Sequence, residues 1–288
     1  MTVLIIGATG QLGHDLMQLF GDDAVGLGHQ DLDVTDGISV SRTIRESAPE
    51  WVINTAAFHR VDDCETNPTL SFAVNATGAA NVARAAEEIG AGVVFYSTDY
   101  VYSGQGRERD QPFRESDPAD PLNVYGISKW AGEQLVMLAN PRHIVVRSAG
   151  LYGTATSRKG WTFPELMVNK ARDEGHLRVV ADQALSPTYT SDLAATTKAL
   201  MEANAAGLFH LTNDGECSWY EFAKATIDLA GLDVPIEATA TTQQPRRAHR
   251  PPYSALTSDR LAATGVAPMR PWREALADYL AAKGIVPG

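Results

Sequence analysis

Cysteine is scarce in this 288-residue sequence. Its two cysteines, Cys64 and Cys217, stand in unrelated contexts, and no CxxC pair or Cys/His ligand spacing occurs. The sequence therefore predicts neither a disulfide framework nor a metal site. Two free thiols fit a reducing compartment, and we expect a cytoplasmic protein.

Long apolar runs and an excess of positive charge are also missing. No stretch approaches the ~20 apolar residues of a membrane span. The first residues lack the basic start of a signal peptide, and we expect them to form a strand. Lys and Arg number 24 against 35 Asp and Glu, which gives a net charge of −11. Such an acidic chain is a poor candidate for binding nucleic acid or an anionic membrane, so an anionic substrate needs a local basic cluster.

Short apolar runs alternate with amphipathic stretches in the first half of the chain. The apolar runs are continuous, which is typical of strands buried on both faces. Strands separated by helices indicate βαβ units, so we predict an α/β fold with a doubly wound parallel sheet. The expected strands are 3–6, 24–27, 51–54, 93–97 and 144–147, and the expected helices are 11–20, 37–47, 69–89 and 122–138.

The alternation loosens after residue 147. We divide the chain there into a domain of residues 1–148, rejoined by part of 188–210, and a smaller mixed lobe of residues 149–288. Ser218 followed by Glu221 predicts a capping box at the start of a helix. The expected helices of this half are 161–173, 190–203, 218–230 and 271–283, and its expected strands are 177–180 and 207–211.

A glycine-rich turn follows the first expected strand directly. Gly7, Gly10 and Gly13 form a G-x-x-G-x-x-G pattern that opens a helix. Glycines let the backbone approach a pyrophosphate, and the helix N-terminus supplies free N–H groups and a positive dipole. The pattern indicates that residues 1–148 bind a dinucleotide, and we assign substrate binding to the smaller lobe.

A group of acidic residues, 31–36, lies about 20 positions after these glycines. A carboxylate in this region can meet the adenosine end of a dinucleotide. The tip of the second strand, residues 27–30, carries no Asp or Glu. We therefore expect NADPH to be tolerated. Asp36 fits equally well as the N-cap of the next helix.

Tyr125 and Lys129 lie one helical turn apart, on the same face of an expected helix. A nearby ammonium group lowers the pKa of a phenol, and a phenol can then act as a general acid. Thr98 follows the expected strand 93–97, where ligands bind in such sheets. Its hydroxyl can hydrogen-bond the same substrate oxygen as Tyr125.

Five segments in this order resemble the extended short-chain dehydrogenase/reductase superfamily, and within it the dTDP-4-dehydrorhamnose reductase family. They are GATGQLG at 7–13, DLDVT at 31–35, NTAAF at 54–58, STDYVY at 97–102 and YGISK at 125–129. In the second half, residues 182–188 and 250–256 also look like this family. The resemblance implies a Rossmann-type fold and reduction of a nucleotide-linked 4-keto-6-deoxy sugar by NADPH, or by NADH, in a monomer or homodimer.

The resemblance also implies roles for individual residues. Thr98, Tyr125 and Lys129 would be catalytic, and Thr98, Asp99, Tyr100 and Arg250 would contact the substrate. Asn75 would support the cofactor and the neighbouring strand, and Lys129 would also bind the nicotinamide ribose. The implied cofactor-binding residues are Gly7, Gly10, Gln11, Leu12, Gly13, Asp33, Val34, Ala56, Ala57, Asn75, Ser97, Tyr125 and Lys129.

Two positions depart from the family pattern. Gly150 stands where the family usually has a Trp, so a sugar-stacking surface is missing. Phe58 replaces a common His. These changes leave the cofactor site intact and leave the identity of the sugar open.

Three arginines are concentrated in residues 246–250. Arginine forks match diphosphate oxygens, and we expect Arg250 to be the principal contact with the substrate diphosphate. A solvated loop with surface ion pairs is the alternative. Arg158 and Lys159 are weaker candidates.

Other functions fit parts of the sequence. A sugar-nucleotide epimerase would share the cofactor site. A 4,6-dehydratase normally has Asp-Glu after the catalytic Thr, whereas Asp99 is followed here by Tyr100. A non-catalytic NADP-binding subunit, like the β subunit of methionine adenosyltransferase, resembles the same family.

Overall fold

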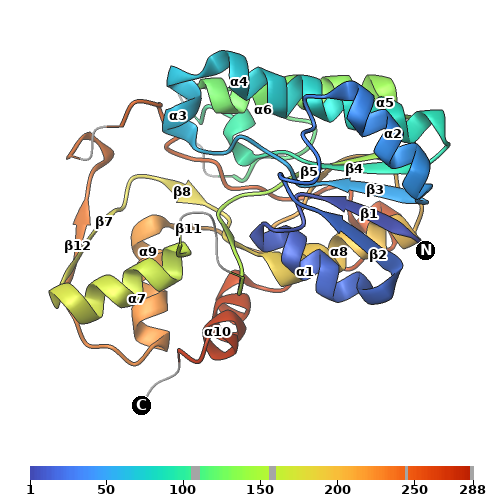
Figure 1. Ribbon diagram of the computed structural model, residues 1–288. Coiled ribbons are helices and arrows are strands. Elements are labelled where there is room, and N and C mark those ends of the chain that lie inside the picture. The colour runs from blue at the N-terminus through green and yellow to red at the C-terminus, as the bar shows by residue number, and fades with distance from the viewer. Residues whose placement is uncertain (105–110, 156–159, 244–245, 286–288) are drawn as a thin grey trace.

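A six-stranded parallel sheet forms the centre of the larger part of the molecule (Figure 1). The computed structural model describes residues 1–104, 111–155, 160–243 and 246–285. The strand order is β10-β5-β4-β3-β1-β2. The predicted α/β class and doubly wound sheet are confirmed. The strands are β1 (Val3–Ile6), β2 (Ala24–Leu27), β3 (Trp51–Asn54), β4 (Gly92–Tyr96), β5 (His143–Arg147) and β10 (Gly207–His210).

Helices cover both faces of this sheet (Figure 1). On one face lie α2 (Gly37–Ser47), α5 (Ala79–Glu88) and α6 (Val124–Ala139), and on the other α1 (Gln11–Phe20) and α8 (Thr190–Glu202). Successive side chains of β1 point to opposite faces. Val3 and Ile5 therefore join the core that includes Leu16 of α1, and Leu4 and Ile6 join the core beneath α2 and α5.

The chain reverses its direction of progress at β1. This strand pairs with β2 on one side and with β3 on the other. The carboxyl ends of β1 and β3 therefore border a topological switch point, where ligands bind in open α/β sheets.

The expected helix at 69–89 is interrupted. Its residues form α4 (Pro68–Phe72), a π-helical stretch from Ala73 to Gly78, and α5. A Cβ on Gly78 would lie 2.7 Å from Val34, so the helix can approach this side chain only through a glycine. A helix that we did not predict, α3 (Val61–Thr66), precedes α4.

The smaller lobe combines three helices with paired short strands. The capping box of Ser218 and Glu221 is confirmed at the start of α9. The strands β6, β8, β9, β11 and β12 were not predicted. The elements are β6 (Leu151–Tyr152), α7 (Phe163–Glu174), β7 (Leu177–Val180), β8 (Ala184–Leu185), β9 (Thr188–Tyr189), β11 (Cys217–Ser218), α9 (Trp219–Leu229), β12 (Ile236–Thr239) and α10 (Trp272–Ala282).

Part of the second half of the chain completes the large sheet. The strand β10 pairs in parallel with β5, and α8 packs beside α1. The division into domains at residue 148 stays a prediction. Within the described ranges, no helix has the length and apolar character needed to cross a membrane. Cys64 and Cys217 are both buried and free.

Candidate active site

The glycine turn connects β1 to α1 at the switch point. Gly7 has a φ of +88°, and a Cβ there would lie 2.4 Å from Thr55 Oγ1. A Cβ on Gly13 would lie 2.3 Å from the carbonyl oxygen of Gly7. Gly10 is the N-cap of α1 and offers no side-chain acceptor to the first turn. The backbone N–H groups of this helix start are therefore left for another acceptor.

The segment after β3 runs beside this turn. Ala56 and Ala57 are partly buried there, and Thr55 Oγ1 donates to the carbonyl oxygens of Ile6 and Gly7. Asn75 is fully buried in the π-helical stretch. Its side chain accepts a hydrogen bond from Phe58 N at 2.8 Å and donates to Phe58 O and to Ser128 Oγ of α6. Asn75 thus joins the 54–58 segment to the helix that carries Tyr125.

Each acidic residue after β2 accepts a different set of local hydrogen bonds. Val34 is buried against Gly78, and Asp33 is exposed and accepts hydrogen bonds from Thr35. Asp36 caps α2 by accepting from the backbone of residues 38 and 39. Asp31 accepts a 2.8 Å hydrogen bond from Gly28 N, so a carboxylate does reach the end of β2. This corrects our expectation that the end of this strand carries no carboxylate, although Asp31 belongs to the acidic group 31–36 named above.

Ser97 and Thr98 lie at the carboxyl end of β4, and both are buried. Ser97 Oγ has no hydrogen-bond partner among the described residues. Thr98 Oγ1 donates to Asp99 Oδ1 at 3.1 Å, and the opposite carboxylate oxygen accepts from Ser254 Oγ at 2.6 Å. Burial raises the pKa of Asp99 to about 6. Ser254 therefore reaches the site from a segment that lies far from it in the sequence.

Tyr125 and Lys129 lie in the first turns of α6, which Asn123 caps by accepting from Gly126 N. The Tyr125 phenol lies beside the side chain of Thr98, so the structure brings these two predicted catalytic residues together, with Lys129 one helical turn further along α6. Lys129 is only 2% exposed, and its Nζ lies 4.0 Å from the centre of the Phe95 ring.

The electrostatics of this pair differ from our expectation. We predicted that the Lys129 ammonium lowers the pKa of the Tyr125 phenol. Burial instead raises the pKa of Tyr125 above its ordinary value. Burial also lowers the pKa of Lys129 to about 7, because an ammonium group is poorly solvated beside Phe95. Near neutral pH Lys129 is only partly charged, so in the protein alone it gives little help to ionisation of the phenol.

Arg250 is already paired in the structure. Its Nη1 and Nη2 donate to the two carboxylate oxygens of Asp62 at 2.9 and 2.8 Å, and Asp62 also accepts from Ala248 N. The guanidinium beside Asp62 holds the pKa of that carboxyl well below its usual range. Arg250 also lies beside the side chain of Tyr100, and the Tyr100 ring meets the Tyr125 ring edge-on, with the ring centres 6.1 Å apart.

The other basic candidates are less informative. Arg246 and Arg247 are exposed. Arg158 and Lys159 lie outside the described residues. Asp62 and Ser254 take part in the site although we assigned them no role. Of the two, only Ser254 lies within a family-like segment quoted above, residues 250–256.

Gly150 has no room for a side chain. Its φ is +54°, and a Cβ would lie 2.6 Å from Leu185 Cδ1. The missing Trp is therefore replaced by a close approach of Leu185 to the backbone. An aromatic ring could be accommodated here only if Leu185 moved.

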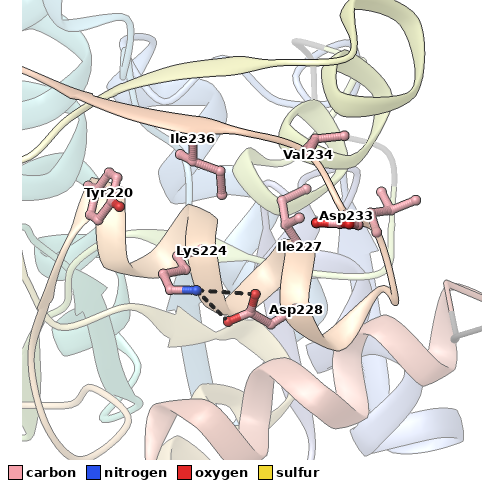
Figure 2. Close-up of a pocket in the computed structure, with 8 residues that line it drawn as sticks. Tyr220, Lys224, Ile227, Asp228, Asp233, Val234 and Ile236 are labelled. Atoms are coloured by element: carbon pink, nitrogen blue, oxygen red, sulfur yellow. Dashed lines mark hydrogen bonds and ion pairs between the residues drawn. The ribbon is translucent and has the colours of Figure 1, made fainter.

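A separate pocket lies in the smaller lobe, between α9 and the segment Leu232–Ile236 (Figure 2). Lys224 and Asp228 form an ion pair at 3.2 Å on its wall. None of the predicted site residues lines this pocket. In the described part of the chain, no three His, Cys, Asp or Glu side chains are grouped so as to hold a metal ion.

Comparison with known proteins gives a consistent result over the whole chain. Residues 1–284 match the family model described as the RmlD substrate binding domain. The dTDP-4-dehydrorhamnose reductase of Mycobacterium tuberculosis is 40% identical over 286 residues, covering 97% of this chain and 92% of that protein. The spore coat polysaccharide biosynthesis protein SpsK of Bacillus subtilis is 39% identical and covers 96% of both chains. The crystal structure of dTDP-4-dehydrorhamnose reductase from Bacillus anthracis in complex with NADP has a TM-score of 0.92 and 35% identity, with 98% and 99% coverage.

Proposed function

The chain belongs to the RmlD substrate binding domain family, and from this membership we propose that it reduces the ketone of a nucleotide-linked 4-keto-6-deoxy sugar. It is an oxidoreductase that uses NADPH, like its dTDP-4-dehydrorhamnose reductase relatives. The observation that carries the proposal is the grouping of Thr98, Tyr125 and Lys129 at the carboxyl end of β4, on the same edge of the parallel sheet as the glycine turn.

The residues at the switch point fit a dinucleotide. The positive φ of Gly7 and the tight packing of Gly13 leave a bare backbone beside the start of α1. Backbone N–H groups of an uncapped helix start suit a pyrophosphate. Ser97 Oγ, buried without a partner among the described residues, offers a further polar contact. Gln11, Leu12, Asp33, Val34, Ala56, Ala57 and Asn75 complete the proposed cofactor site together with Gly10, Tyr125 and Lys129.

The chemistry divides between cofactor and protein. When bound, NADPH supplies a hydride for the sugar ketone. Tyr125 gives the proton that the resulting alkoxide needs, and its raised pKa ensures that this proton is present at neutral pH. Thr98 orients the phenol, and Lys129 stabilises the negative charge left on it when Lys129 is protonated.

The substrate would lie between the two parts of the molecule. Asp99 and Tyr100 follow Thr98, and Arg250 contacts Tyr100. We assign the diphosphate to Arg250, which would share its guanidinium between Asp62 and the ligand. Because Leu185 fills the space beside Gly150, recognition of the sugar cannot depend on ring stacking at that position.

An assay with NADPH and a dTDP-4-keto-6-deoxy sugar tests the proposal. We expect stoichiometric oxidation of NADPH and formation of the 4-hydroxy sugar. Tightly bound cofactor in the purified protein and an isomeric product would instead indicate an epimerase. Cofactor binding without turnover on any such sugar would indicate a regulatory subunit.

A further inference from the structure

A buried ion pair lies one turn beyond Lys129 on α6. Glu133 is 0% exposed, and its two carboxylate oxygens accept from Nε and Nη2 of Arg147 at 2.9 and 2.6 Å. Arg147 ends β5 and is 3% exposed. Its third nitrogen donates to the Tyr102 hydroxyl at 2.6 Å. The guanidinium is therefore fixed by two partners.

The pairing is notable because Glu133 has another cation at hand. Lys129 and Glu133 are at i and i+4, the spacing at which Lys and Glu form ion pairs on helices. A buried site strengthens that attraction. Glu133 nevertheless pairs with Arg147, and the Lys129 ammonium lies over the Phe95 ring.

We propose that Arg147 is a positioning residue for catalysis: by holding both oxygens of Glu133, it prevents this carboxylate from capturing the Lys129 ammonium. Lys129 then stays available to the cofactor and to Tyr125. The inference rests on the proposed function for the role of Lys129, but its electrostatic consequence can be measured without substrate.

The charges around Lys129 predict how its pKa should rank among three variants. The charged and titratable groups of this region are Tyr125 and Glu133 on α6, Arg147 on β5, Asp99, Tyr100 and Tyr102 after β4, Cys64 on α3, and His210 at the end of β10. Arg147→Gln leaves Glu133 unneutralised and should raise the pKa of Lys129. Glu133→Gln leaves a lone guanidinium and should lower it. The double variant replaces an ion pair of zero net charge by two uncharged side chains. The pKa of Lys129 should therefore return close to its value in the unmodified protein.

The first measurement uses the cofactor-free protein. The chain has six lysines, so protein labelled with carbon-13 at lysine Cε gives few resonances, and a Lys129→Met variant identifies that of Lys129. The pH titration of this resonance should place the Lys129 pKa highest in Arg147→Gln and lowest in Glu133→Gln. An unchanged pKa in Arg147→Gln would overturn the proposal, whatever the enzyme acts on.

The second measurement is turnover at saturating NADPH and sugar nucleotide. The kcat of Arg147→Gln should fall roughly tenfold to a hundredfold, which is part of the rate enhancement that a general acid contributes. Adding Glu133→Gln should restore kcat to within about fivefold of the unmodified enzyme, because no carboxylate is then left at this position to pair with the Lys129 ammonium. A double variant as slow as Arg147→Gln would contradict the proposal, because removing the Glu133 carboxylate should leave the Lys129 ammonium free.

Stability must be separated from positioning. Breaking a buried pair destabilises a protein strongly, whereas neutral replacement of both partners is often tolerated. If Arg147→Gln fails to fold, the Lys129 pKa in the other two variants decides: the proposal requires a lowered value in Glu133→Gln and a value close to that of the unmodified protein in the double variant. Arg270→Gln, which removes the ion pair with Asp192 elsewhere, is the matched control and should leave the Lys129 pKa unchanged.

Discussion

The hydroxyl of Ser254 donates a 2.6 Å hydrogen bond to the Asp99 carboxylate across 155 positions of the sequence. Asp99 in turn accepts from Thr98, whose side chain lies beside the Tyr125 phenol. A segment of the second half therefore supports the candidate catalytic residues directly. This contact makes the geometry of the site depend on how that segment packs against the sheet.

Ser254→Ala should destabilise the protein more at about pH 8 than at about pH 5. Burial raises the folded-state pKa of Asp99 to about 6, and the Ser254 hydrogen bond partly offsets that rise. The ionised carboxylate is thus disfavoured in the folded state, and stability is lost as the pH rises through this window. Removing the hydrogen bond should raise the pKa of Asp99 further and enlarge the loss of folding stability at high pH. Urea unfolding at both pH values measures it.

A surface serine provides the control for this comparison. Ser41 Oγ donates to the exposed carboxylate of Glu88 at 3.1 Å. Ser41→Ala should have a small effect that does not change between the two pH values. An equally flat profile for Ser254→Ala would show that Asp99 does not titrate in this range.

Tyr125→Phe should reduce turnover by ~10²–10⁴ and leave NADPH affinity within a few-fold. The variant removes the only atom that we assign to proton donation while keeping the ring against Tyr100. Steady-state kinetics and a fluorescence titration with NADPH give the two values. Turnover within threefold of the unmodified enzyme would exclude Tyr125 as the acid.

NADPH should bind at least as well as NADH, and Asp31→Asn should increase this preference. The Asp31 carboxylate lies at the end of β2, where its charge disfavours the extra phosphate of NADPH. Asparagine keeps an acceptor for Gly28 N without the charge. Titration of both proteins with both cofactors tests the idea. A tenfold preference of the unmodified protein for NADH would refute the first expectation, and an unchanged preference in Asp31→Asn would refute the role of Asp31.

Arg250→Ala should raise the KM for the sugar nucleotide by roughly tenfold to a hundredfold, as expected for a lost charge-assisted hydrogen bond. NADPH affinity should change little, and the effect should shrink at high salt because screening weakens a partly exposed contact. The variant also leaves the Asp62 carboxylate unpaired. The double variant Asp62→Asn/Arg250→Ala removes that complication.

The double variant separates two roles of Arg250. A KM that stays high indicates direct contact with the diphosphate. A KM that returns to normal means that Arg250 only neutralises Asp62, which is contrary to our assignment. Loss of NADPH binding in Arg250→Ala would instead place the loop in the cofactor site.

Local signals in the sequence predicted much of the fold. The bounds of β1 and α1 agree with the structure because Gly7, Gly10 and Gly21 mark the turn between them and the end of the helix. The π-helical stretch at 73–78 was not predictable, since it depends on contacts of Asn75 and Gly78 with residues from other elements. The two-residue strands were missed for the same reason, because each exists only through a distant partner.

In the candidate site, too, the features marked by local sequence motifs were predicted and those that depend on distant contacts were missed. The order of the motifs along the chain allowed Thr98, Tyr125 and Lys129 to be chosen. The pairing of Arg250 with Asp62 joins residues 188 positions apart, and no local pattern indicates it. The lowered pKa of Lys129 was missed as well, because it follows from burial beside Phe95 and not from helical spacing.

The central claim is a net transfer of hydride from NADPH to a nucleotide-linked keto sugar. The most direct measurement uses NADPH that carries deuterium at the transferable position, a dTDP-4-keto-6-deoxy sugar, and mass spectrometry of the product. We predict one deuterium on the sugar ring for each NADPH oxidised. A product without deuterium, or an isomer of the substrate formed while NADPH is unchanged, would contradict the account.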